Sequence, residues 1–218
     1  MPSKRVRALI PLFASVVAVW SCGGGGDSND NGQGAPAPAP IPPLSQPPTD
    51  ISGTGASVGM DYWGTTSNAN GGKGETIDGI PCRVMDETYH IHTHLSIVLN
   101  GQLLMVPNGL GQVPATATTS GCFYQIHNHD GSGRLHIESP VPVNYTLGNF
   151  FHIWGQPLSA TNVGGITGQP IVFYITDNGV TTRFDGDPGT IPLTSKRLIT
   201  IQIGSQLNAI PNFTWSGT

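Results

Sequence analysis

Apolar and polar residues alternate with a period of two between residues 89 and 107, the pattern of paired β-strands that bury one face. One parity is apolar apart from Thr93 and comprises Tyr89, Ile91, Leu95, Ile97 and Leu99. The other parity carries His90, His92, His94, Ser96 and Val98. Asn100-Gly101 is typical of a two-residue hairpin turn. That turn pairs Leu99 with Gln102, Ile97 with Leu104 and Leu95 with Val106.

A second hairpin is predicted over residues 122–139, with Asp130 to Gly133 as its turn. The expected pairs are His129 with Arg134, His127 with His136, and Gln125 with Glu138. The apolar face would then carry Tyr124, Ile126, Leu135 and Ile137. The opposite face would gather four side chains that can bind metal, namely His127, His129, His136 and Glu138.

The rest of the pattern adds one short helix and more strands. Apolar residues at helical spacing predict a helix near 147–154, with Thr146 as its N-cap and Gly155 at its end. Residues 170–184 predict a third hairpin, 197–203 a half-buried strand, and 60–63 an edge strand. The expected fold is therefore all-β, an antiparallel sandwich or a small barrel, formed by one domain over residues 53–218.

Composition narrows the classes of partner. Only 10% of the 218 residues are charged, while 30 glycines and 19 prolines suit a β-protein rich in turns. The formal net charge is −4, and three of the nine basic residues precede residue 8, so we expect no binding to nucleic acid. The chain has no phosphate-binding loop and no catalytic dyad with a nucleophile, and no protein partner follows from the sequence.

The first 52 residues predict export. A basic segment with Lys4, Arg5 and Arg7 precedes an apolar run over 8–19, and together they predict a signal peptide; the run is too short to cross a bilayer. Residues 19–22 resemble the lipobox of bacterial lipoproteins, which implies removal of residues 1–21, lipidation of Cys22 and attachment to the outer membrane, facing the periplasm or the cell surface. An ordinary cleaved secretory signal is the alternative. Residues 22–52 are rich in Gly and Pro and predict a disordered tether.

The chain has three cysteines, Cys22, Cys82 and Cys122. Lipidation of Cys22 would leave two thiols in an oxidising compartment, so we expect a disulfide between Cys82 and Cys122. In the alternative interpretation, these two thiols bind a soft metal beside the histidines.

The two hairpins share a repeated six-residue motif, Tyr-His-Ile-His-Thr-His at 89–94 and Tyr-Gln-Ile-His-Asn-His at 124–129. Histidines two residues apart on a strand point to the same side, so neighbouring strands can close a metal site. The predicted ligands are His92, His94, His127, His129 and His136, followed by His90. Copper or zinc suits imidazole, with iron or manganese possible if Glu138 joins. Met105 and His152 are secondary candidates, for which core packing and a surface role are the alternatives.

Several known families share parts of this pattern. The repeated motif is similar to the cupin motif, in which a Glu follows His-x-His within a few residues and a late strand supplies another His. Here Glu138 lies nine residues after His129, and His152 is the only histidine after Glu138. Copper–zinc superoxide dismutase also has a strand His-x-His, but its acidic zinc loop has no counterpart here. The segments YHIHTHLSIVLNGQ, CFYQIHNHDGSGRLHIESP and YTLGNFFHIWGQPL resemble an uncharacterised family of exported microbial proteins over residues 80–158. That resemblance implies no activity.

Three hypotheses about function follow. The first is a carrier, buffer or sensor of copper or zinc at the cell envelope. The second is a metalloenzyme with an open coordination position and Glu138 as general base. The third is a structural or adhesion module in which the histidines are incidental.

Overall fold

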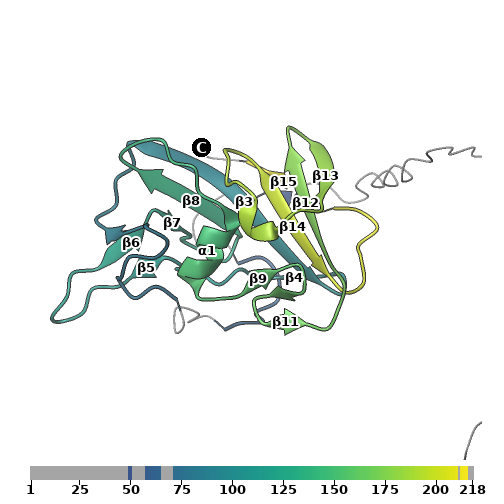
Figure 1. Ribbon diagram of the computed structural model, residues 1–218, viewed down its shortest axis with the longest axis horizontal. Helices are drawn as coiled ribbons and strands as arrows, with labels where there is room; N and C mark the ends of the chain where they lie inside the picture. Colours follow the sequence, from purple (N-terminus) through teal and green to yellow (C-terminus); the bar gives the residue numbers. More distant parts are fainter. Residues whose placement is uncertain (1–48, 51–56, 65–70, 211, 216–218) are drawn as a thin grey trace, which may run out of the picture. The chain divides into compact units, whose positions relative to one another are not determined.

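The strand β3 (Tyr89–Leu99) lies inside the largest sheet of the computed structural model, which describes residues 49–50, 57–64, 71–210 and 212–215. The seven-stranded sheet has the order β13-β12-β14-β3-β8-β7, and β4 also pairs with β3 (Figure 1). Its other strands are β4 Gln102–Leu104, β7 Ile126–His127, β8 Arg134–Ser139, β12 Ile171–Asp177, β13 Val180–Phe184 and β14 Leu198–Ile203. Among the described residues this sheet is open, which confirms the all-β sandwich rather than the small barrel.

The first hairpin forms with the predicted turn and is shorter than expected. Asn100 and Gly101 have φ angles of 50° and 81°, as the turn requires, and Leu99 pairs with Gln102. The pairing ends at Leu104, so the predicted pair of Leu95 with Val106 does not form. The second hairpin occupies that edge instead, because the Leu95 N–H donates to the carbonyl of Gly133.

The second hairpin keeps the predicted register at His127 and Gln125, but its pairing stops at His127, so the predicted pair of His129 with Arg134 does not form. Its first arm is also divided between two sheets. His127 pairs with His136 in β7 and β8, and the Glu138 N–H donates to the carbonyl of Gln125. The preceding residues form β6 (Cys122–Tyr124), which pairs instead with β2 (Cys82–Arg83) and β5 (Gln112–Val113). The predicted Cys82–Cys122 disulfide joins β2 to β6. Strand β8 also pairs with β3, so the two histidine-bearing hairpins adjoin in one sheet.

The strand β14 differs from its prediction in two ways. It runs parallel to β3, so the sheet is mixed rather than wholly antiparallel. All six of its residues are buried, so the prediction of a half-buried strand is wrong. On the face away from the main core, Leu198 packs against Phe213 and Trp215. Phe213 belongs to β15 (Phe213–Thr214), which pairs with β1 (Thr49–Asp50).

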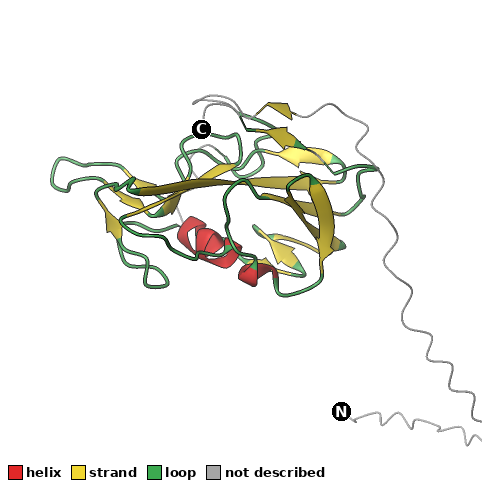
Figure 2. Ribbon diagram, turned by 90° about the horizontal axis from the view of Figure 1, so that it is seen from above, coloured by secondary structure: helices red, strands yellow, loops and turns green. Residues whose placement is uncertain are grey.

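The helix α1 (Leu147–Trp154) covers the opposite face of the large sheet (Figure 2). As predicted, it begins after Thr146 and ends at Gly155, which has a left-handed backbone with φ of 71°. Its side chains Leu147, Phe150, Phe151, Ile153 and Trp154 are fully buried in the main core. Three short strands share that core, β9 (Leu158–Ser159), β10 (Asn162–Val163) and β11 (Ile166–Thr167). No helix in the described part of the chain is long and apolar enough to span a membrane.

Replacing Thr146 with alanine should lower the free energy of unfolding by about 1 kcal/mol. The Thr146 hydroxyl accepts from the N–H of Asn149, and the Asn149 side chain accepts in return from the N–H of Thr146. Alanine removes the first of these bonds, whereas Thr146→Ser keeps a hydroxyl and should lose much less. Urea unfolding followed by circular dichroism gives both values, and equal losses in the two variants would contradict a role for the hydroxyl.

Some predictions concern segments at the margins of the described chain. The signal peptide, the lipobox-like residues 19–22 and most of the tether lie outside the described residues. Thr49–Asp50, which the sequence assigns to the tether, forms β1. In the segment predicted as an edge strand, Met60 makes an isolated bridge to Leu104.

Candidate metal centre

The histidines of the two hairpins meet because β3, β8 and β7 lie side by side. The register aligns His92, His136 and His127 in one row across the three strands. In the next row, Glu138 lies between His90 and Gln125. Cβ atoms of directly opposed residues are about 5 Å apart, within reach for imidazoles to share an ion. The neighbouring Leu135 and Ile137 of β8 point to the core on the opposite face.

The donor atoms form two groups that could each hold a metal ion. The first comprises His127, His129, His136 and Glu138, and the second His90, His92 and His136. Within each group, the donor atoms lie within 4.8 Å of one another. These groups include five of the six predicted histidine ligands, together with Glu138.

The separations within the first group match a coordination sphere. His127 Nε2 lies 3.1 Å from His129 Nε2 and 3.6 Å from Glu138 Oε2. His136 Nδ1 lies 3.1 Å from Glu138 Oε1. Ligands bound tetrahedrally at about 2.1 Å from a zinc ion are about 3.4 Å apart, so these atoms need to move little to bind an ion.

The second group converges on a single nitrogen atom. His136 Nδ1 lies 3.1 Å from His90 Nε2 and 3.2 Å from His92 Nε2. Glu138 Oε1 is also 3.1 Å from His90 Nε2, so the carboxylate borders both groups. On its other side, the His90 ring has Nδ1 3.9 Å from a carboxylate oxygen of Glu87, which is beyond hydrogen-bonding distance.

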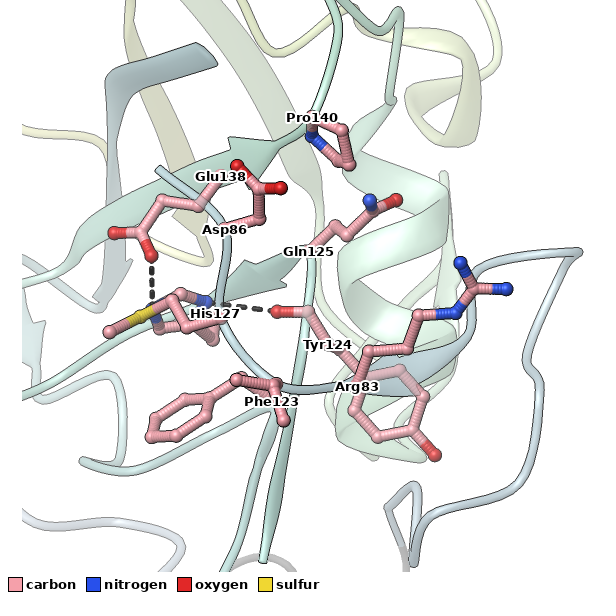
Figure 3. A pocket seen from close by; sticks show the side chains of 10 residues that line it. Arg83, Asp86, Phe123, Tyr124, Gln125, His127, Glu138 and Pro140 are labelled. Atoms are coloured by element: carbon pink, nitrogen blue, oxygen red, sulfur yellow. Dashed lines mark hydrogen bonds and ion pairs between the residues drawn. The ribbon is translucent and has the colours of Figure 1, made fainter. Parts of the chain in front are cut away.

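His127 and Glu138 form the buried part of the centre. The His127 side chain is fully buried, and its Nδ1–H donates to the carbonyl of Tyr124 over 2.9 Å (Figure 3). That bond leaves the Nε2 lone pair available for a metal. The Glu138 side chain is 3% exposed, and its Oε2 has no hydrogen-bond partner. A buried carboxylate oxygen without a donor is well suited to a cation.

Electrostatics favours the protonation states that bind metal. Burial lowers the pKa of His127 to about 4, and burial together with the neighbouring His136 and His90 lowers the pKa of His92 to about 3. Burial also lowers the pKa of His129. For Glu138, burial alone would raise the pKa, but the hydrogen bond from His136 and the charges of nearby histidines lower it. At neutral pH, His92, His127 and His129 are therefore neutral imidazoles and Glu138 is a carboxylate, and these are the forms that bind metals.

His94 lies outside both groups, although the sequence places it on the same face. Its side chain is 1% exposed and packs against Phe213, with ring centroids 3.7 Å apart. Its Nε2–H donates to the carbonyl of Ser132, and its Nδ1 accepts from the hydroxyl of Ser96. Both ring nitrogens are therefore already satisfied within the protein. Burial lowers the pKa of His94 to about 3, which keeps the ring neutral.

The secondary candidates also lie outside these groups. Met105 is buried, and its Sδ packs closely against Gly131 in the turn of the second hairpin. His152 lies on the surface of α1, where its Nδ1 is 2.6 Å from Oδ2 of Asp78. Cys82 and Cys122 are bonded to each other, so their alternative role as thiolate ligands does not apply.

A pocket of about 190 Å³ opens beside the buried ligands and was not expected from the sequence. His127 and Glu138 line it together with residues of the segment that follows Cys82, notably Arg83, Met85 and Asp86 (Figure 3). It is smaller than the roughly 300–1,000 Å³ of sites for drug-sized ligands. The predicted disulfide could have indicated this pocket, because it holds the residues after Cys82 next to β6.

The centre therefore combines five imidazoles and one carboxylate, from three strands and, for His129, from the turn that follows β7. Imidazole suits zinc and copper, and an added carboxylate also suits iron or manganese. Comparisons of the whole chain with protein-family models, with curated proteins and with solved structures find no match.

Proposed function

We propose that the chain is an extracytoplasmic metal-binding protein that holds copper or zinc through its strand histidines, as a carrier, buffer or sensor. The observation that carries this proposal is the convergence of His127, His129, His136 and Glu138, whose donor atoms lie within 4.8 Å of one another. This convergence counts against a structural module with incidental histidines, because histidines without a common role need not bring their donor atoms together.

The cellular location belongs to the same proposal. A lipid at Cys22 and the Gly- and Pro-rich residues that follow would hold the domain at the outer membrane, facing the periplasm or the cell surface. The Cys82–Cys122 disulfide supports an oxidising compartment. The membrane, through this anchor, and the metal ion are the proposed partners.

The mature exported chain should contain at least one equivalent of zinc or copper after reconstitution. His127→Ala should reduce the bound metal severalfold, because it removes a fully buried donor from the first group. His152→Ala is the matched control, since that exposed histidine pairs with Asp78 and belongs to neither group. Elemental analysis after gel filtration gives the stoichiometry. Less than about a tenth of an equivalent of every transition metal in the unaltered chain would rule out the proposal.

The pocket favours a second candidate, a metalloenzyme with Glu138 as general base. His127 and Glu138 both line this pocket, so an ion bound between them would be accessible to a small substrate. Catalytic metals keep an open coordination position for water or substrate, whereas structural sites are closed. X-ray absorption spectroscopy of the loaded protein distinguishes the two candidates, because a water ligand that azide or cyanide replaces favours the enzyme.

A further inference from the structure

We propose that the centre holds two metal ions, bridged by the carboxylate of Glu138. This inference rests on the proposed metal binding and adds to it the number of ions and the division of the ligands. The six donor side chains fall into two groups rather than one. Two ligands of one zinc ion are at most about 4.2 Å apart, which is twice the length of a zinc–nitrogen bond. The six donor atoms do not all lie within 4.8 Å of one another, so one ion cannot reach all of them.

The shortest separations assign each donor to one of two positions. The outer position has His90 Nε2 and His92 Nε2 around His136 Nδ1, at 3.1 and 3.2 Å. The inner position has His127 Nε2 and His129 Nε2, which are 3.1 Å apart. These edges match a zinc or copper coordination polyhedron, so each position already has the dimensions of a site.

Glu138 presents one oxygen to each position. Its Oε1 lies 3.1 Å from both His90 Nε2 and His136 Nδ1 on the outer side. Its Oε2 lies 3.6 Å from His127 Nε2 on the inner side and has no hydrogen-bond donor. The carboxylate is 3% exposed, so water does not compensate that oxygen. A carboxylate that bridges two ions satisfies both oxygens.

The register explains why the bridge is Glu138. The strand β8 lies between β3 and β7, so its residues are the ones that reach histidines on both sides. The outer position draws on β3 and the inner position on the arm that contains β7. Two-metal sites in enzymes hold their ions about 3.5–4 Å apart, a spacing that one bridging carboxylate can span.

The two positions differ in their access to ligands. The outer position has the three histidines of the second group, His90, His92 and His136. Glu138 Oε1 lies 3.1 Å from the donor atoms of two of them, His90 and His136. The inner position has His127, His129 and Glu138, and one coordination site stays open there when His136 Nδ1 binds the outer ion. Two of these three residues line the pocket, which assigns any exchange of ligand or substrate to the inner ion.

Titration of the metal-free mature chain with zinc should end at two equivalents per chain, measured by elemental analysis after dialysis. His92→Ala and His129→Ala should each leave one equivalent, because each removes a donor from one position only. Loading with copper(II) adds an independent readout. Two bridged copper ions couple magnetically, so the integrated paramagnetic resonance signal should be well below two spins, and one full spin should return in His92→Ala.

The outcomes separate this inference from the proposed function. Saturation of the unaltered chain at one equivalent, or two equivalents of copper with two uncoupled spins, would overturn the two-ion centre while metal binding stands. Absence of bound metal would overturn both. Because the His92 ring lies near Trp215, His92→Ala could disturb folding. His90→Ala tests the same position at a side chain that is 31% exposed.

Discussion

Replacing His136 with alanine should weaken the tightest zinc binding of this protein by at least about 100-fold, since even the loss of a residue that only orients a ligand costs about 10–100-fold. His136 is the one histidine that both donor groups contain. Its Nδ1 also lies 3.1 Å from Glu138 Oε1, so the variant removes a ligand and frees the carboxylate of another. Competition with a chromophoric chelator at constant pH measures the affinity.

The matched comparison for His136→Ala is His152→Ala, which removes an imidazole that pairs with Asp78 on the helix. It should bind zinc as tightly as the unaltered chain. Zinc should also raise the melting temperature of the unaltered chain, because a ligand that binds only the folded state stabilises it. That shift should nearly disappear in His136→Ala. A loss of affinity below tenfold in His136→Ala would show that the shared histidine does not bind the metal.

Local patterns predicted the hairpins because a strand has a simple rule for its faces. Side chains alternate with period two, and a two-residue turn fixes which residues oppose each other. From this rule alone, the pairing of His127 with His136 was predicted and is confirmed. The rule does not say which hairpins adjoin. The row that joins His92 to His136 depends on pairing between β3 and β8, which are separated by more than thirty residues of sequence.

His94 shows what a face pattern leaves open. It has the same parity as His90 and His92, and no local feature of the sequence distinguishes it from them. His94 differs from His90 and His92 because a residue from outside the sheet packs on it. Phe213 covers His94, while the end of β3 nearer His90 stays partly exposed. Phe213 also packs on Leu198 of β14, and it lies more than 110 positions after His94, so no local window of sequence contains both.

Removing the Cys82–Cys122 disulfide should lower the free energy of unfolding by about 4 kcal/mol, since the bond closes a loop of about 40 residues. The reason is the greater conformational freedom of the unfolded chain without the crosslink. The small sheet cannot easily compensate, because β2 and β5 have two residues each. Urea unfolding of Cys82→Ala/Cys122→Ala gives the value, and the reduced unaltered chain should match it.

The same variant also shows how much the metal centre depends on this crosslink. The disulfide fixes β6, and Tyr124 at its end accepts the hydrogen bond that orients His127. His127 remains paired with His136 through β7 and β8, and the Glu138 N–H still reaches Gln125. We therefore expect zinc affinity to fall by about tenfold, the scale of losing an orienting partner. A larger loss than in His136→Ala would mean that the small sheet, rather than the paired strands, holds the ligands in place.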